Sequence, residues 1–319
     1  MRDETRDRVK LVVLAAVALG CIALYMLSHL VGNLDYILPR RLMKLSAIVL
    51  TGVVIAFSTV VFQTITNNRI LTPSIIGLDA LYMFINTVFV FLFGSAAFVF
   101  MDDNLMFLLS AGVMMLFSLL LYRLMFRRDG TNIFFVLLVG IVLGTFFRSA
   151  TSFMQMLIDP NEFLVIQDRM FASFNNVKTN LLFIALLTVA AVMLYFLRFA
   201  KYLDVLALGR DHAINLGVEY DAIVSRLFVI VAALVSIATA LVGPITFLGL
   251  IVANVAYQFM STFRHRQVMA AAALISIVML VGGQWVVERV FTFSTTLSVI
   301  INFVGGIYFL YLVLRESKA

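Results

Sequence analysis

The sequence predicts an all-α protein that crosses a membrane about ten times. Hydrophobic residues make up 63% of the 319 residues and charged residues only 13%, about half of the charged share in a soluble domain. Long runs without Asp, Glu, Lys or Arg recur along the chain, and a helix needs about 20 such residues to cross a bilayer. The runs are continuous and not alternating, so they indicate helices and exclude a membrane β-barrel.

One of the charge-free runs is too long for a single crossing. The runs are Leu11–Leu34, Leu45–Asn68, Ala80–Met101, Asn104–Tyr122, Gly130–Phe147, Thr179–Leu197, Leu227–Phe263, Gln267–Val287 and Val290–Leu314. As a helix, Leu227–Phe263 would extend about 55 Å. We divide it at Gly243 and Pro244, because proline cannot continue a helix interior and glycine permits a bend. Residues 1–319 are thus predicted to form one transmembrane domain with ten spans.

The basic residues predict the orientation of these spans. With ten spans both termini share one side, and 16 of the 23 Lys and Arg residues fall in segments on that side. Cytoplasmic segments carry such an excess, so both termini are predicted in the cytoplasm. The cations are dispersed over many loops, which argues against binding to nucleic acid. Cys21 is the only cysteine and the three histidines are far apart, so no disulfide or metal site is predicted.

A short charged segment, residues 205–221 (VLALGRDHAINLGVEYD), interrupts the apolar chain between the sixth and seventh spans. Two glycines bracket a helical pattern, and the predicted orientation places the segment in the cytoplasm. A short helix there can fit a groove on a partner protein and transmit motion to the attached spans. Packing on loops of its own chain is the alternative, and spacing alone does not decide between the two.

Several segments resemble the permease subunits of iron-siderophore and vitamin B12 ABC importers, the FecCD-like family. Residues 208–218 resemble the family's coupling helix, and residues 38–40, 68–77, 243–250 and 305–311 resemble other motifs in the same order. The likeness covers nearly the whole chain. The stretch NRILTPSIIGLDALY is most similar to the second permease of catecholate-type siderophore systems, such as those for petrobactin, anguibactin or vibriobactin.

The resemblance implies a type II importer permease, similar in fold to the vitamin B12 permease, in a bacterial cell membrane. The implied partners are ABC ATPase subunits, an extracytoplasmic siderophore-binding protein and a sister permease, with a heterodimer favoured over a homodimer. The chain itself is expected to bind no cofactor: ATP and Mg belong to the ATPase, and iron travels as a siderophore complex. A phosphate-binding G-x-x-x-x-G-K-[ST] loop is absent from the sequence, so the chain is not expected to hydrolyse ATP.

The resemblance also assigns roles to individual residues. Coupling to the ATPase is implied for Leu208, Gly209, Arg210, Asp211, Ala213, Leu216 and Gly217. Docking of the binding protein is implied for Arg40, Arg41 and Arg289. For Arg40 and Arg41, ordinary interfacial snorkelling of long cationic side chains is the alternative.

Arg148 interrupts what would otherwise be a longer fifth span, and it is a candidate for the translocation path, because a charge at that depth is costly and usually faces a cavity or an acidic partner. A ferric catecholate complex is anionic and would suit a cation there; a buried structural pair is the alternative. Gln155, Asn86 and Asn302 are further candidates, although such polar residues often make interhelical hydrogen bonds. Bends are predicted at Pro73, Gly77, Gly243, Pro244 and Gly249.

A secondary transporter coupled to an ion gradient is the alternative function. It would need paired carboxylates within the membrane, and the sequence offers only Asp79, near a predicted membrane edge. Asp79 itself is predicted to cap the helix of the third span. An intramembrane enzyme would need a catalytic constellation, and none is visible.

Overall fold

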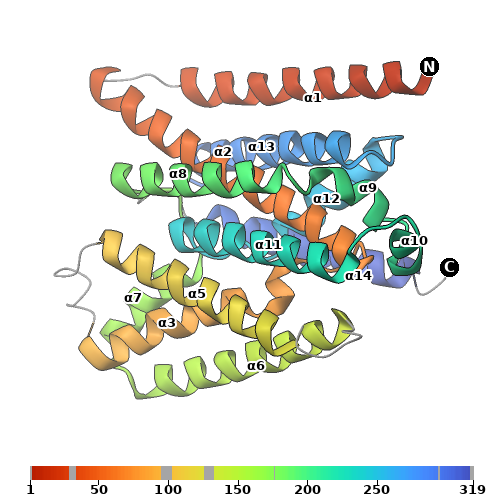
Figure 1. Ribbon diagram of the computed structural model, residues 1–319. Coiled ribbons are helices and arrows are strands. Elements are labelled where there is room, and N and C mark those ends of the chain that lie inside the picture. The colour runs from red at the N-terminus through yellow and green to blue at the C-terminus, as the bar shows by residue number, and fades with distance from the viewer. Residues whose placement is uncertain are drawn as a thin grey trace.

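The structure, a computed structural model, describes residues 2–28, 34–94, 103–125, 133–175, 177–293 and 295–316. Within these ranges the chain forms helices and loops without a strand, and the predicted all-helical fold is confirmed. Figure 1 shows the long helices side by side in one bundle. The predicted span boundaries at Met101 and Gly130, and the cations Arg127, Arg128 and Lys318 used for the orientation, lie outside the described residues.

Ten apolar helices of the described ranges follow the order of the ten predicted spans. Eight are long and apolar enough to cross a membrane: α1 (Arg2–Leu27), α2 (Leu34–Thr66), α5 (Asp103–Met125), α6 (Ile133–Leu157), α8 (Thr179–Phe196), α11 (Tyr220–Val242), α13 (His265–Arg289) and α14 (Leu297–Glu316). Two are shorter: α3 (Leu78–Phe93) and α12 (Leu248–Phe259). The connections contain η1 (Pro73–Ile76), α7 (Pro160–Met170), η2 (Ala200–Tyr202), α9 (Leu203–Leu206) and α10 (Arg210–Asn215).

Helix α2 is longer than predicted, because it begins at Leu34 and not at Leu45. Its 33 residues extend about 50 Å, well beyond the roughly 30 Å of hydrocarbon in a bilayer. The first turns, which carry three basic residues, therefore project out of the apolar layer. A charge-free run marks the part of a helix that lipid surrounds, not the whole helix, and this explains the difference.

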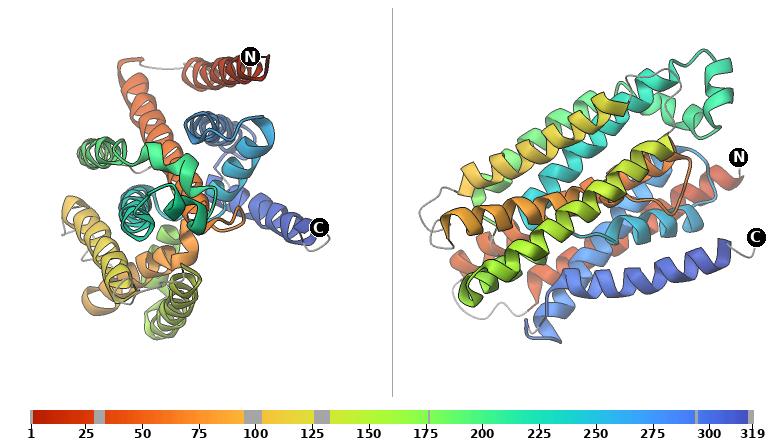
Figure 2. Two further views of the ribbon diagram at one scale, coloured as in Figure 1. Left: turned by 45° about the vertical axis from the view of Figure 1, so that its right-hand side comes forward. Right: turned by 90° about the horizontal axis from the view of Figure 1, so that it is seen from below.

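Helices α2 and α11 form the centre of the bundle. In their most apolar windows 72% and 83% of the residues are buried, against 11% in α1 and 22% in both α6 and α8. The centre of α11 is rich in small residues, such as Ala232, Ala233 and Ser236, which allow neighbouring helices to approach closely. Figure 2 shows α1, α6, α8 and α14 around the perimeter.

Both termini lie at the same end of the bundle, together with α9 and α10 (Figures 1 and 2). We call this the α10 end; the opposite end, which carries α7 and the start of α2, is the α7 end. A contact between distant segments fixes the N-terminal helix at the α10 end: the Asp7 carboxylate accepts a hydrogen bond of 3.1 Å from the backbone N–H of Ser261. An even number of spans requires this arrangement of the termini.

Candidate transport path and docking surfaces

Helices α3 and α12 follow breaks in the chain, at four of the five positions where bends are predicted. Pro73 opens η1, and Gly77 joins η1 to α3 with a φ of 88°. Gly243 ends α11 with a φ of 96°, and Pro244 follows in the loop before α12. Glycine suits these left-handed positions because it lacks a Cβ. Each of the two short helices consequently begins at a break in the chain, and not as the continuation of one long transmembrane helix.

Gly249 differs from its predicted role as a bend. It lies in the first turn of α12, where an added Cβ would collide with the side chain of Thr59 on α2. Its small size therefore serves helix packing and not a change of direction. Sequence alone cannot separate the two roles of a glycine, since both exploit the missing side chain.

The starts of α3 and α12 meet inside the bundle. Helix α12 has 12 residues, about 18 Å, and ends at the α10 end, so its first turn lies partway along the bundle. The hydroxyl of Thr246, two residues before α12, donates to the Asp79 carboxylate at 3.2 Å. Asp79 lies in the first turn of α3, and Gly77 takes the cap position predicted for Asp79. A carboxylate in a first helical turn is stabilised by the helix dipole.

Helix α6 packs against η1 through backbone atoms. An added Cβ at Gly77 would lie 2.8 Å from Gly144 Cα, and one at Gly140 would lie 2.9 Å from Ile76 Cα. Gly140 and Gly144 are one helical turn apart, the spacing that brings membrane helices into close contact. This contact was not predicted, although the G-x-x-x-G pattern in VGIVLGT could have indicated it.

A cavity of about 350 Å³ opens beside this contact. Residues 70–77, α6, the start of α12 and Phe309 of α14 line it, and Arg148 and Thr246 supply its polar groups together with Thr72 and Ser74. Arg148 lies near the middle of the apolar segment Leu137–Leu157. Its Nη2 donates to Thr145 Oγ1 at 3.4 Å. Within the described part of the chain, Arg148 has no carboxylate at salt-bridge distance.

The other polar candidates for the path are placed differently. Gln155 lies two turns from Arg148 on α6, and its amide nitrogen is buried without a hydrogen-bond partner among the described residues. Asn302 accepts from the backbone N–H of Phe247 at 3.5 Å, at the rim of the cavity. Asn86 lies elsewhere: it lines a separate cavity of about 430 Å³ under α7, where Arg169 Nη1 donates to its side-chain oxygen at 3.4 Å.

At the α7 end, Arg41 and Arg289 both contact the last carbonyl groups of α1. Nη1 of Arg41 donates to the carbonyl oxygens of Tyr25, Met26 and Ser28 at 3.1, 2.9 and 2.7 Å. Nη2 of Arg289 lies 3.5 Å from the Ser28 oxygen. Cations suit the carbonyl end of a helix. These two arginines hold α1, α2 and α13 together.

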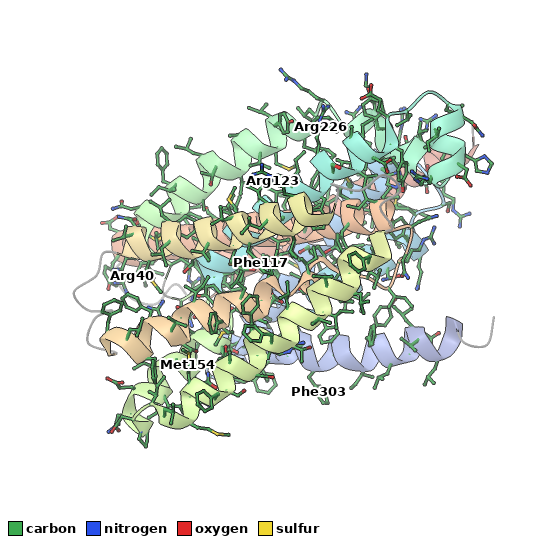
Figure 3. The ribbon with its side chains drawn as sticks, turned by 60° about the horizontal axis from the view of Figure 1, so that its bottom comes forward. Arg40, Phe117, Arg123, Met154, Arg226 and Phe303 are labelled. Carbon is green, nitrogen blue, oxygen red and sulfur yellow. The ribbon has the colours of Figure 1, made fainter. Side chains whose placement is uncertain are left out.

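Arg40 is the most accessible of the three arginines predicted to dock a partner. It is exposed, it lies 4.3 Å from the centre of the Tyr36 ring, and it lines a cavity of about 680 Å³. Figure 3 shows it at the end of the bundle opposite to α10. Lys44 borders the same cavity but forms an ion pair of 2.8 Å with Glu288. Arg40 is therefore the guanidinium best placed to meet an approaching acidic protein.

A prediction separates Arg40 from Arg41. Reversing the charge with Arg40→Glu is expected to slow association with an acidic docking partner about tenfold, less at high salt, without lowering thermal stability. Arg41→Gln is expected to lower stability by about 1–3 kcal/mol, because three carbonyl groups lose their donor. Binding kinetics and thermal unfolding of the purified complex measure the two effects. Equal losses of stability in both variants would contradict this assignment.

The charged segment 205–221 forms a compact helical unit at the α10 end. Gly209, at φ 92°, precedes α10, and Gly217, at φ 80°, ends it. The N–H groups of Gly217 and Val218 donate to the carbonyls of Ile214 and Ala213, which is the Schellman arrangement of a helix end. Arg210 pairs with Asp221 at 3.2 Å, and Asp211 is exposed. The predicted short helix is thus closed at both ends by glycine.

This unit buries one side and leaves apolar residues on the other. Ala213 is fully buried, whereas Leu208 and Leu216 are 55% and 63% exposed. Behind it, Asp204 of α9 accepts from both the backbone N–H and the ring Nδ1 of His265 at 2.8 and 2.7 Å. The contact links the unit to the first residue of α13. Leu208 and Leu216 thus leave apolar surface on the outer side of the unit.

Comparisons with known proteins agree with this architecture. The sequence model of the FecCD transport family matches residues 9–315. The petrobactin import system permease protein YclO of Bacillus subtilis is 59% identical over 314 residues, which cover 98% of this chain and 99% of the relative. The petrobactin permease FatC of Bacillus anthracis is 38% identical over 88% of this chain and 79% of its own.

A solved structure of an inward-facing ABC transporter, assigned to the metal-chelate type, has the same fold. Its TM-score is 0.82, with 96% of this chain and 98% of that chain aligned at 19% identity. The alignment covers nearly the whole of both chains, so the similarity is that of the whole bundle. At this identity the likeness concerns architecture alone.

Proposed function

The chain belongs to the FecCD transport family, and on that premise we propose that it is the permease subunit of an ATP-driven importer of ferric siderophores. The observation that carries the proposal is the 59% identity to a petrobactin permease over 98% of the chain. Ferric petrobactin is accordingly the first substrate to test. An ion-coupled secondary transporter is not favoured, since the described residues place one carboxylate, Asp79, behind the cavity wall at Thr246 and not the pair such coupling requires.

The energy source in this proposal is an ABC ATPase that docks on segment 205–221. The exposed Leu208 and Leu216 supply the apolar contact, and the glycine-closed ends of α10 make the unit stiff enough to transmit a push. ATP and Mg bind to that partner. ATP-driven closure of the ATPase would move the unit, and Asp204 with His265 would pass the motion to α13.

A sister permease is proposed to cover the face formed by α6 and α14. This face exposes a row of large apolar side chains: Phe135, Leu138, Ile141, Val142, Phe146 and Phe153 on α6, and Phe303, Val304, Ile307, Leu310, Tyr311 and Leu314 on α14. Figure 3 shows Phe303 pointing away from the bundle. Arg148 is exposed on α6 at mid-span, and a guanidinium facing lipid at that depth would cost several kcal/mol.

The sister is proposed to be a different chain. Two petrobactin permeases of Bacillus anthracis, FatC and FatD, are 38% and 26% identical to this chain, which fits a system with two unlike permeases. The interface between this chain and its sister permease would enclose the cavity beside Arg148, which would serve as the translocation path. An extracytoplasmic binding protein would deliver the ferric complex at the α7 end, near Arg40. The termini and α10 would then face the cytoplasm of the bacterial cell.

Purification of the tagged chain tests this proposal. An ABC ATPase and a second permease of different sequence are expected to copurify with it. In liposomes, the complex with its binding protein is expected to accumulate radioactive iron as ferric petrobactin when ATP is supplied to the ATPase side. Uptake by the chain alone without ATP would contradict the proposal and favour the secondary transporter.

A further inference from the structure

A basic cavity lies at the α7 end, where both α2 and α8 begin (Figure 1). It is the cavity of about 680 Å³ beside Arg40, a volume in the range of small-molecule sites. Among the described residues, its charged lining consists of Arg40, Arg41, Lys44, Lys178 and Glu288. Four cations and one carboxylate leave an excess of three positive charges.

Contacts within the wall neutralise one of the four cations. Lys44 Nζ lies 2.8 Å from the Glu288 carboxylate, so these two charges cancel. Arg41 donates to carbonyl groups at the end of α1, and the Arg40 guanidinium lies against the Tyr36 ring. Carbonyl groups and rings carry no net charge, so these contacts leave the excess in place. An anion in this cavity would therefore be attracted.

The cavity lies at the level where a transmembrane span meets water. Lys178 directly precedes the apolar span Thr179–Phe196, and the first turns of α2 project beyond the apolar layer. Tyr25 and Tyr36 also line the cavity, and tyrosine is enriched at the membrane–water interface. Phospholipid headgroups occupy this level, and basic pockets between transmembrane helices bind anionic headgroups.

An exposed apolar surface continues from the cavity along α8. Thr179 lines the cavity, and its hydroxyl donates to Met43 Sδ of α2 at 3.5 Å. Phe183 and Leu186 follow Thr179 at intervals of four and seven residues, so they lie on the same side of the helix. They are 62% and 46% exposed. Acyl chains attached to a phosphate in the cavity would cover this surface, whereas free phosphate would leave it bare.

We propose that the cavity between α2 and α8 binds the phosphate of an anionic phospholipid in the leaflet at the α7 end. Arg40 and Lys178 are the cations that meet the phosphate, and the acyl chains lie along Phe183 and Leu186. Glu288 limits the strength of the site, because it neutralises Lys44. A carboxylate of a docked protein is the other anion that such a cavity could attract. The position at the membrane boundary and the apolar surface of α8 favour the lipid.

Retention of phosphatidylglycerol by the purified complex tests the proposal. The complex is reconstituted in nanodiscs of phosphatidylcholine and phosphatidylglycerol, and native mass spectrometry measures which lipid stays bound after release. Lys178→Gln is expected to weaken retention of phosphatidylglycerol about fivefold, the effect of one cation near an anionic headgroup. Glu288→Gln is expected to strengthen it about as much, because Lys44 is no longer neutralised. Lys201→Gln, the same substitution as at Lys178 but at the α10 end, is the matched control and should change nothing.

A second measurement separates the lipid from free phosphate. Phosphatidylglycerol is expected to raise the thermal midpoint of the wild-type complex above its value in phosphatidylcholine alone, and to raise it less for Lys178→Gln. Inorganic phosphate added to nanodiscs of phosphatidylcholine is expected to leave the midpoint unchanged.

Three outcomes overturn the inference. One is equal retention of phosphatidylglycerol by the wild type and Lys178→Gln, and another is equal stabilisation by inorganic phosphate, which would make the cavity a site for the free anion. The third is a Lys178→Gln variant that slows docking of the binding protein without losing lipid, which would assign the cavity to the docking surface. Should Glu288→Gln fail to fold, the comparison of Lys178→Gln with Lys201→Gln still decides, because Lys178 is exposed. None of these measurements depends on which substrate the complex transports.

Discussion

Replacing Leu208 and Leu216 by aspartate is expected to release the ATPase while leaving the permease folded. The two side chains are 55% and 63% exposed, so the permease loses little of its own packing. Burial of one leucine at an interface contributes about 1.5–3 kcal/mol, and a carboxylate forced into the same contact adds a desolvation cost. Together the changes are expected to weaken ATPase binding at least about 100-fold.

The amount of ATPase that copurifies with a tagged permease measures this effect directly. Uptake of the ferric complex should fall in parallel, because the energy source is lost. Lys201→Glu, a charge change on the same end of the bundle but outside segment 205–221, is the control and should retain the ATPase. Wild-type amounts of ATPase on the double aspartate variant would show that the exposed leucines bind something else.

Most of the architecture could be predicted because it follows from two causes: the lipid that surrounds the helices, and the backbone preferences of glycine and proline. Lipid demands long apolar helices, so the runs without charge revealed the spans, and Gly243 with Pro244 revealed the break in the longest one. The glycines at 209 and 217 delimited α10 for the same reason, since each adopts a positive φ. These are local properties, written in short stretches of sequence.

Contacts between distant segments could not be predicted in this way. Arg41 was expected to meet a partner protein, yet it donates to carbonyl groups at the end of α1. The sequence makes Asn86 a candidate for the same path as Arg148, yet it lines a different cavity with Arg169. A polar side chain in an apolar helix indicates that a polar neighbour exists, but only the packing of the helices decides which one.

Gly77→Ala is expected to cause the largest loss of stability among single substitutions in the cavity wall. At φ 88° an alanine is strained by about 1–2 kcal/mol, and its Cβ would lie 2.8 Å from Gly144 Cα. Both partners of that clash are backbone, so η1 and α6 must separate, which adds about 1–3 kcal/mol. The expected total of about 2–5 kcal/mol is measurable as a lower thermal midpoint of the purified complex.

Gly144→Ala separates the two causes, because residue 144 is helical and its added Cβ is crowded by the Gly77 Cα, at 3.1 Å, while the Arg148 guanidinium lies at an ordinary contact distance of 3.8 Å. Its cost is expected to equal the packing share alone, and the difference between the variants gives the strain at φ 88°. Gly112→Ala on α5 is the control: nothing lies within 4 Å of its Cβ, and alanine favours a helix by up to about 1 kcal/mol.

The functional loss in Gly77→Ala is expected to exceed what the lower stability explains. Gly77, Gly144 and Arg148 all line the cavity, so separation of η1 from α6 changes the shape of its wall, and the variant combines a weaker fold with a distorted path. Uptake measured well below the thermal midpoint should therefore fall for Gly77→Ala and, less strongly, for Gly144→Ala. If both variants transport at the wild-type rate at low temperature, the contact between η1 and α6 supports the fold but has no part in the path.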